Sequence, residues 1–187
     1  MTKKIGLILG STRQGRISPS IASWVESVAA KNPNVEIEIL DLKEINLPWF
    51  DEPTTPSVAP GVSEAAISWA SKITSKDGLI ILTPEYNAGY PAPLKNAIDY
   101  LKPELQNRPV FIVSYGYGGG ASAAHQLVEV FNRIGAPVIE PGVQILIGDK
   151  LNETGGIDTP VETLAIHDAE LEVGLTRIVE FVPTEAV

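Results

Sequence analysis

The fold is decided by the stretch Gly10-Ser11-Thr12-Arg13-Gln14-Gly15-Arg16-Ile17-Ser18, which separates two periodic segments of different kinds. The segment before it, Ile5 to Leu9, is a short apolar run typical of a buried parallel strand. The segment after it, Ile21 to Ala29, carries its apolar residues at helical spacing. The stretch itself holds two glycines, three hydroxyls and two guanidiniums. We therefore interpret it as a strand-to-helix loop that can bind an anion through backbone N–H groups, short donors and fixed positive charge.

The composition limits the class of protein. A length of 187 residues predicts a single domain over residues 1–187. The formal net charge of −9 argues against broad binding to nucleic acid or anionic membranes, so Arg13 and Arg16 are local positive charges on an acidic protein. The lack of cysteine excludes disulfides and thiol catalysis. With no signal-peptide pattern and no apolar run near the roughly 18–20 residues of a membrane span, we expect a cytoplasmic protein without a membrane partner.

Strand-like and helix-like segments alternate along the rest of the chain. Ser18-Pro19 is interpreted as the N-cap and first residue of the first helix. Further strands are expected at 35–40, 79–83, 110–113 and 138–147, the last interrupted at Pro141-Gly142, and further helices at 62–75, 94–101, 124–134 and 160–181. Apolar and acidic residues alternate in 35–40, as in an edge strand, whereas 79–83 is apolar throughout, as in a central one. The pattern predicts an α/β fold: a flavodoxin-like three-layer sandwich with a five-stranded parallel sheet of order 2-1-3-4-5.

In that strand order the loops after the first, third and fourth strands meet at one edge of the sheet. The loop after the third strand, Thr83 to Pro93, is rich in proline and tyrosine and suits the edge and face of a flat ring. The loop after the fourth, Ser114 to Gly120, offers N–H groups at a helix N-terminus to a partly negative oxygen. The first loop has neither G-x-G-x-x-G nor G-K-[ST] spacing, which favours a terminal phosphate. Each loop is also compatible with a purely structural turn.

Two features remain open at this point. The stretch Asp41 to Pro60 has four prolines and the aromatic pair Trp49-Phe50, and it is long for a loop in a compact domain. It is either a functional loop or a variable surface loop with both aromatics in the core. His125 and His167 have no evident partners in the sequence. His125 either approaches the site from the start of its helix or is a solvated helix residue.

The three loops together closely resemble the NADPH-dependent FMN reductase family. The motifs that carry the resemblance are Gly10-Ser11-Thr12-Arg13 with Ser18-Pro19, Thr83-Pro84-Glu85-Tyr86-Asn87 running into Leu94-Lys95-Asn96-Ala97, and Ser114-Tyr115-Gly116. Leu47 to Glu52 is similar to the quinone, azo-dye and chromate reductase branch. The resemblance covers about Lys4 to Ile147. Many relatives have an arginine just after the glycine loop, Ser114 to Gly120. This chain has Ala121-Ser122-Ala123 there, so the preference between NADPH and NADH stays open.

The resemblance implies FMN as cofactor and NADPH or NADH as reductant. The residues implied to hold the cofactor are Ser11, Arg13, Arg16 and Ser18 at the phosphate, Pro84, Glu85, Tyr86 and Asn87 around the isoalloxazine ring, and Ser114, Tyr115, Gly116 and Gly118 at its pyrimidine side. A flavin performs the hydride chemistry itself, so no catalytic acid–base residue and no metal are expected.

The resemblance also implies ping-pong transfer of two electrons to a small-molecule acceptor, such as a quinone, an azo compound, chromate or free flavin. It implies a homodimer in which Trp49, Phe50 and Tyr90 are candidates for covering the partner's flavin. Two alternatives share the fold: a flavodoxin-type electron carrier, and a flavin-free regulatory or binding module.

Overall fold

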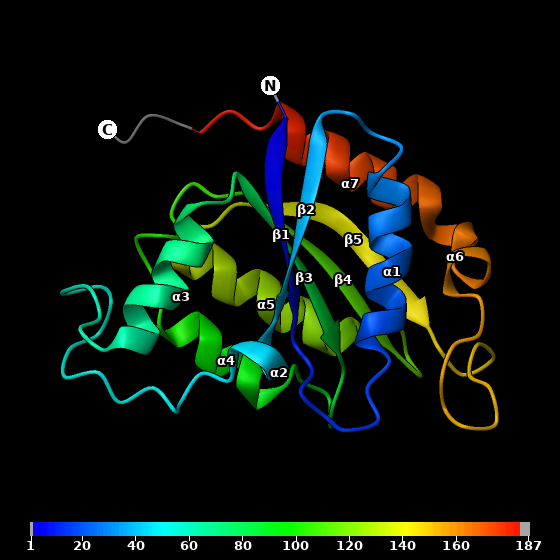
Figure 1. Cartoon of the computed structure of the whole chain (residues 1–187), viewed down its shortest axis with the longest axis horizontal. Helices are drawn as coiled ribbons and strands as arrows, with labels where there is room; N and C mark the ends of the chain where they lie inside the picture. Colours follow the sequence, from blue (N-terminus) through cyan, green and yellow to red (C-terminus); the bar gives the residue numbers. More distant parts are fainter. Residues whose placement is uncertain (1, 184–187) are drawn as a thin grey trace.

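The computed structural model describes residues 2–183 and contains a five-stranded parallel sheet of order β2-β1-β3-β4-β5 (Figure 1). The strands are β1 (Lys3–Leu9), β2 (Val35–Asp41), β3 (Gly78–Pro84), β4 (Val110–Gly116) and β5 (Val138–Leu146). The predicted strand order and parallel directions are confirmed. β2 alternates between half-buried and exposed residues over most of its length, as expected of an edge strand, whereas β3 and β4 are buried throughout.

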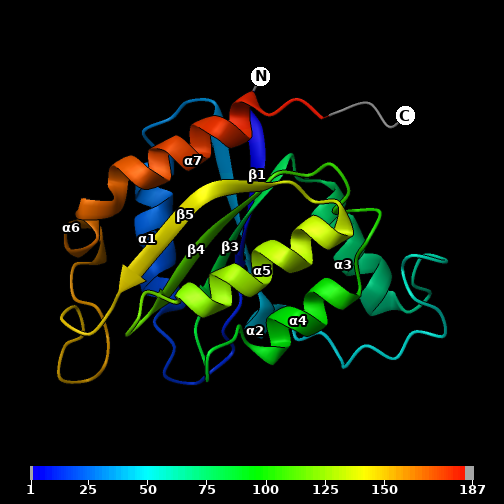
Figure 2. The ribbon, with the colours of Figure 1, turned by 180° about the vertical axis from the view of Figure 1, so that it is seen from behind.

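Helices cover both faces of this sheet (Figures 1 and 2). One layer contains α1 (Ser18–Ala29), α6 (Pro160–Thr163) and α7 (Asp168–Glu180), and the other contains α2 (Leu42–Ile45), α3 (Glu64–Thr74), α4 (Ala92–Asp99) and α5 (Ala121–Ile134). Successive residues of β3 point to opposite faces. Ile80 and Leu82 therefore pack with the α1–α7 layer, while Leu79 and Ile81 pack with the other. Burial on both faces explains why the central strands are apolar throughout.

Three segments differ from the expectation. The helix expected over 160–181 is divided into α6, a 3₁₀ turn at Ala165–His167 and α7. The Asp168 carboxylate, at the restart, accepts hydrogen bonds from Trp24 of α1 and from Lys31, which follows that helix. The irregular stretch 41–60 contains the short helix α2, and the helix expected over 62–75 begins only at Glu64. β5 is one continuous strand, which absorbs Pro141-Gly142 by a register shift against β4.

All five strands end at the same edge of the sheet, at the bottom of Figure 1. The loops that follow β1, β3 and β4 lie there, as does α2. Within residues 2–183 no helix is long and apolar enough to cross a bilayer.

Candidate functional site

The loops after β1, β3 and β4 form one site at the carboxyl edge of the sheet, as the strand order predicted. Ser11 Oγ and Tyr86 Oη share a hydrogen bond of 2.8 Å, which joins the first loop to the second. The Glu85 N–H donates to the Tyr115 carbonyl at 3.0 Å, which joins the second loop to the end of β4. The sheet register also places Pro84 beside Tyr115.

Residues 10–18, called the anion loop from here on, contain hydrogen-bond donors that the protein leaves unused. Ser18 is the first residue of α1 and not its N-cap, which is Ile17, so the predicted cap is wrong by one position. The Ser18 hydroxyl is fully buried. Within residues 2–183, Ser18 Oγ and Tyr115 Oη are the buried side-chain oxygens that lack a hydrogen-bond partner. Because such atoms are uncommon in native proteins, the two hydroxyls suit a polar ligand atom.

The Tyr115 hydroxyl lies next to the anion loop. Burial raises the pKa of Tyr115, and the nearby Tyr86 adds to the rise. The hydroxyls of Ser18 and Ser11 and the charge of Arg13 lower this pKa, but burial has the larger effect. The phenol therefore stays protonated and can donate a hydrogen bond. Its neighbours Ser11, Arg13 and Ser18 place the hydroxyl beside residues 10–18, while its backbone carbonyl accepts the hydrogen bond from the Glu85 N–H.

The two arginines of the loop have different roles. Arg13 is exposed, donates to the Gly15 carbonyl at 2.7 Å, and forms no ion pair with any carboxylate of residues 2–183. Arg16 is largely buried and forms a two-bond ion pair with Asp41, with both N–O distances at 2.5 Å. It also donates to the Ser11 carbonyl at 2.8 Å. Arg13 is thus available to a ligand, whereas Arg16 positions the loop against the end of β2.

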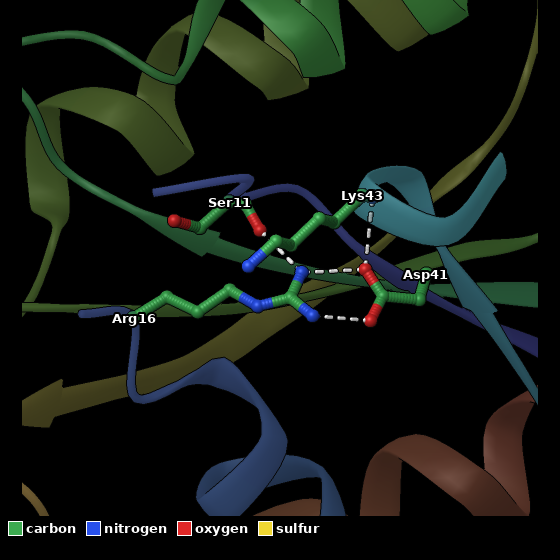
Figure 3. A network of polar contacts seen from close by, with 4 residues as sticks. All are labelled: Ser11, Arg16, Asp41 and Lys43. Carbon is green, nitrogen blue, oxygen red and sulfur yellow. Dashed lines mark hydrogen bonds and ion pairs between the residues drawn. The ribbon is translucent and has the colours of Figure 1, made fainter. Parts of the chain in front are cut away.

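Asp41 also joins the loop to α2 (Figure 3). Its carboxylate accepts a hydrogen bond from the Lys43 N–H at 3.0 Å, which caps the helix. The Lys43 side chain extends across the Arg16–Asp41 pair toward Ser11, and its ammonium has no ionic or hydrogen-bond partner among the described residues. The sequence interpretation missed both Asp41 and Lys43. Asp41 could have been found from the parallel pairing of β1 with β2, which places it beside Leu9, just before the loop begins.

The segment Tyr86 to Gly89 is a tight turn at the mouth of the site. The N–H groups of its two end residues each donate to the other's carbonyl. Asn87 (φ 50°) and Ala88 (φ 61°) both adopt the left-handed conformation of a type I′ turn. Gln126 Nε2 of α5 donates to the Ala88 carbonyl at 2.7 Å. The turn is therefore anchored and presents the partly exposed ring of Tyr86.

The Glu85 carboxylate occupies the N-terminus of α5. It accepts hydrogen bonds from the N–H groups of Ser122 at 2.8 Å and Ala123 at 3.4 Å. These two helix N–H groups are therefore not free for a ligand, and the acidic side chain caps the helix. Ser114 Oγ donates to the Gly119 carbonyl at 2.8 Å and holds the glycine loop closed. Gly118 is exposed, with open space where a Cβ would lie, so its backbone is accessible.

A cleft of about 360 Å³ lies beside the anion loop. It is lined by Thr12, Leu42, Lys43, Asn46, Leu47, Trp49, Pro93 and Asn96. The Asn96 amide fixes one wall, since Nδ2 donates to the Pro48 carbonyl at 2.7 Å and Oδ1 accepts from the Phe50 N–H at 2.8 Å. The Phe50 ring packs edge-on against Tyr100, but Trp49 is 72% exposed. Of the two interpretations of this stretch, packing of both aromatics into the core is therefore wrong for Trp49.

The histidines lie outside this arrangement. The His125 side chain is exposed, with Nε2 at 3.6 Å from Glu129 Oε1, so its interpretation as a solvated helix residue is confirmed. His167 Nδ1 lies 2.9 Å from Glu170 Oε2. Among the described residues, no group of three or more His, Cys, Asp or Glu side chains could hold a metal ion.

A sequence profile described as NADPH-dependent FMN reductase matches residues 3–149, which include all three loops of the site. The chain belongs to the NADPH-dependent FMN reductase family. The resemblance drawn from the loop motifs is thereby confirmed. The family is one of FMN-linked oxidoreductases, which confirms the predicted class of enzyme and cofactor at the level of the family.

Individual relatives agree with this family assignment. An NAD(P)H-dependent FMN reductase of Schizosaccharomyces pombe is 43% identical over 132 residues, which are 70% of this chain and 66% of the relative. The chain thus spans just under two thirds of that relative. An NAD(P)H-dependent FMN reductase of Saccharomyces cerevisiae is 35% identical over 191 residues, covering 95% of this chain and 97% of the relative. A quinone reductase of Escherichia coli is 32% identical over 149 residues, covering 74% and 76%.

Solved structures agree on the fold. The flavoenzyme NAD(P)H:acceptor oxidoreductase FerB from Paracoccus denitrificans superposes with a TM-score of 0.75 and 20% sequence identity. The superposition covers 96% of this chain and 99% of FerB. At this identity the likeness establishes the shared flavodoxin-like architecture.

Proposed function

We propose that this protein is an NAD(P)H oxidoreductase that binds FMN at the carboxyl edge of its sheet and passes electrons to a small-molecule acceptor. The observation that carries the proposal is a set of available donors: the buried hydroxyls of Ser18 and Tyr115, which lack a partner in the protein, and the exposed guanidinium of Arg13, whose charge is not paired with any carboxylate of residues 2–183. A phosphate dianion accepts several charge-assisted hydrogen bonds at once, so these residues fit the terminal phosphate of FMN. Family membership supports the same cofactor.

The other two loops would orient the flat ring system. We place it between the Pro84–Asn87 segment and the Ser114–Gly118 segment, because the Glu85–Tyr115 hydrogen bond sets these two loops side by side. Tyr86 would align the ring with the phosphate, since its hydroxyl is bonded to Ser11. Bound FMN supplies the exchange of hydride with nicotinamide and acceptor. The chain's own residues bind it and orient it.

The proposed acceptor is a quinone-like molecule, with azo compounds, chromate and free flavin as further substrates to assay. The likeness to an Escherichia coli quinone reductase supports this choice. Because reductant and acceptor would use the same open face of the site, we propose ping-pong kinetics in which the oxidised nicotinamide leaves before the acceptor binds. Initial rates at several fixed acceptor concentrations should give parallel double-reciprocal lines. Intersecting lines would contradict this order.

We further propose that the protein acts in the cytoplasm as a homodimer. Exposed apolar side chains occur around the start of α3, at Val58, Val62 and Ile67, and such groups suit a protein interface. Light scattering during size-exclusion chromatography should give about twice the 20.0 kDa chain mass. A monomeric mass at micromolar concentration would contradict the dimer.

The absorbance spectrum of the purified protein tests the central proposal. We expect flavin bands, stoichiometric rebinding of FMN after the cofactor is stripped, and anaerobic bleaching by NADPH or NADH with no partner reductase. Bound flavin that neither nicotinamide bleaches would indicate a flavodoxin-type carrier. Failure to bind added FMN would indicate a flavin-free module. Either result would overturn the proposed activity.

A further inference from the structure

Lys43 is a second cation at the carboxyl edge, after Arg13, whose charge is not paired with any carboxylate of residues 2–183. Its N–H is held by Asp41, and its side chain extends toward Ser11 (Figure 3). The Asp41 carboxylate does not neutralise this ammonium, because both of its oxygens bond to Arg16 at 2.5 Å. On a chain of net charge −9, an unpaired lysine beside a cleft favours an anionic ligand at that place.

The cleft beside Lys43 has the size and lining of a nucleoside site. Its volume of about 360 Å³ lies in the range of ligand pockets, roughly 300–1,000 Å³. Leu42 and Leu47 contribute apolar surface, and Asn46 contributes an amide. The Trp49 ring, 72% exposed at the cleft, offers a flat face on which a purine can stack.

This cleft is structurally tied to the anion loop. Thr12 belongs to both, and the Arg16–Asp41 pair fixes α2 against the loop. Arg13 and Ser18 can serve one phosphate, so Lys43 remains for a second. The reductants NADPH and NADH both carry an adenosine, and they differ only by the phosphate on its 2′ oxygen. The unpaired cation matches the phosphate that distinguishes them, and the exposed indole matches the purine that both carry.

We infer that this cleft binds the adenosine end of the reductant and that Lys43 recognises its 2′-phosphate, which selects NADPH over NADH. The inference rests on the proposed function. It assigns the selection to α2 and not to Ala121-Ser122-Ala123, the segment after the glycine loop, which carries no cation. Trp49 acts as a positioning residue that orients the purine, and this role replaces the one in which it would cover a partner's flavin.

Steady-state kinetics of the FMN-loaded enzyme test the role of Lys43. In Lys43→Ala, the ratio of kcat/KM for NADPH to that for NADH should fall about tenfold, through a higher KM for NADPH, because one charged hydrogen bond is lost. Lys43→Arg should keep the preference. Lys72→Ala removes an exposed lysine of α3 and should leave the ratio unchanged. An unchanged ratio in Lys43→Ala would overturn the inference.

A binding measurement separates this inference from the proposed activity. Calorimetry should show adenosine 2′,5′-bisphosphate binding about tenfold more tightly than ADP to the wild-type protein, and equally to Lys43→Ala. Because Trp24 and Trp69 are buried, fluorescence quenching by either nucleotide should come from Trp49 and disappear in Trp49→Leu. Equal binding of both nucleotides to the wild type would overturn the inference while FMN absorbance and bleaching stay intact. If the wild-type protein did not bind FMN, the proposed activity would be overturned, but the calorimetric comparison of the two nucleotides would still be valid.

Discussion

Two aspartates each join separate elements of this protein, and their surroundings differ. Asp168, the first residue of α7, accepts hydrogen bonds from Trp24 Nε1 and Lys31 Nζ, both at 2.8 Å, and so joins α7 to α1 and the residues after it. Asp41, the last residue of β2, accepts from Arg16 and from the Lys43 N–H, and so joins the anion loop to α2.

The difference lies in what each network leaves unpaired. Around Asp168, Lys31 has a second acidic neighbour, Glu172, at 3.7 Å. Around Asp41, the described residues provide no carboxylate for Arg13 or Lys43 and no partner for the buried hydroxyl of Ser18. The buried hydroxyls of Ser18 and Tyr115 cost stability without a partner, and the exposed charges of Arg13 and Lys43 lie at the same edge, so this edge is suited to a ligand. The hydrogen bonds of Asp168 therefore stabilise the packing of α7, whereas those of Asp41 hold the anion loop in place for a ligand.

Asp41→Ala should have the largest effect. The Arg16 and Asp41 side chains are only 9% and 15% exposed, and removing one partner of a buried pair costs about 3 kcal/mol. Urea unfolding should show this loss, and the Kd for FMN should rise at least about tenfold because the loop is no longer held. A stable variant with wild-type FMN affinity would show that the Arg16–Asp41 pair does not position the loop.

Arg13→Ala should separate binding from stability. Loss of one charge-assisted contact to phosphate should weaken FMN about thirtyfold, or about 2 kcal/mol, measured by fluorescence titration of the stripped protein. The free energy of unfolding without FMN should change by less than about 0.5 kcal/mol, because the side chain is exposed. Arg133→Ala, an exposed arginine at the end of α5, is the matched control. Equal FMN affinity in the two variants would remove Arg13 from the site.

The sequence was sufficient for the sheet and for the meeting of the three loops. Both follow from local patterns, since segments buried on two faces are apolar throughout and strand order places their ends together. It could not separate Arg13 from Arg16, which look equivalent within the loop. Their difference arises from Asp41, 25 residues from Arg16. Likewise, the Glu85 carboxylate caps a helix 37 residues further along the chain, which no local pattern indicates.

The divided helix at 160–181 was missed for a related reason. Leu164, Leu171 and Leu175 are all buried and keep a helical spacing across the break, so the apolar pattern continues where the backbone does not. At the restart of the helix, Asp168 makes long-range contacts with Trp24 and Lys31, which the local pattern does not contain.

Asp168→Asn should affect stability alone, by about 1 kcal/mol, with FMN affinity unchanged. The hydrogen bonds from Lys31 and then Trp24 lower the pKa of Asp168 below its usual value. A carboxyl with a lower pKa in the folded state stabilises at neutral pH, and this contribution disappears as pH falls below about 4. Urea unfolding at neutral and acidic pH should therefore show a larger difference between wild type and variant at neutral pH. An equal difference at both would exclude the charge of Asp168 as the cause.

Ser18→Ala should have the smallest effect on stability, but it should distinguish most clearly a hydroxyl that serves the ligand from one that serves the fold. Without FMN, removing a buried hydroxyl that has no partner should leave the free energy of unfolding unchanged or raise it by up to about 0.5 kcal/mol. With FMN, the lost hydrogen bond should raise the Kd about fivefold. Ser23→Ala, an exposed serine of α1 bonded to the Ser20 carbonyl, should not alter FMN affinity. Marked destabilisation of the FMN-free Ser18 variant would mean that this hydroxyl serves the fold and not the ligand.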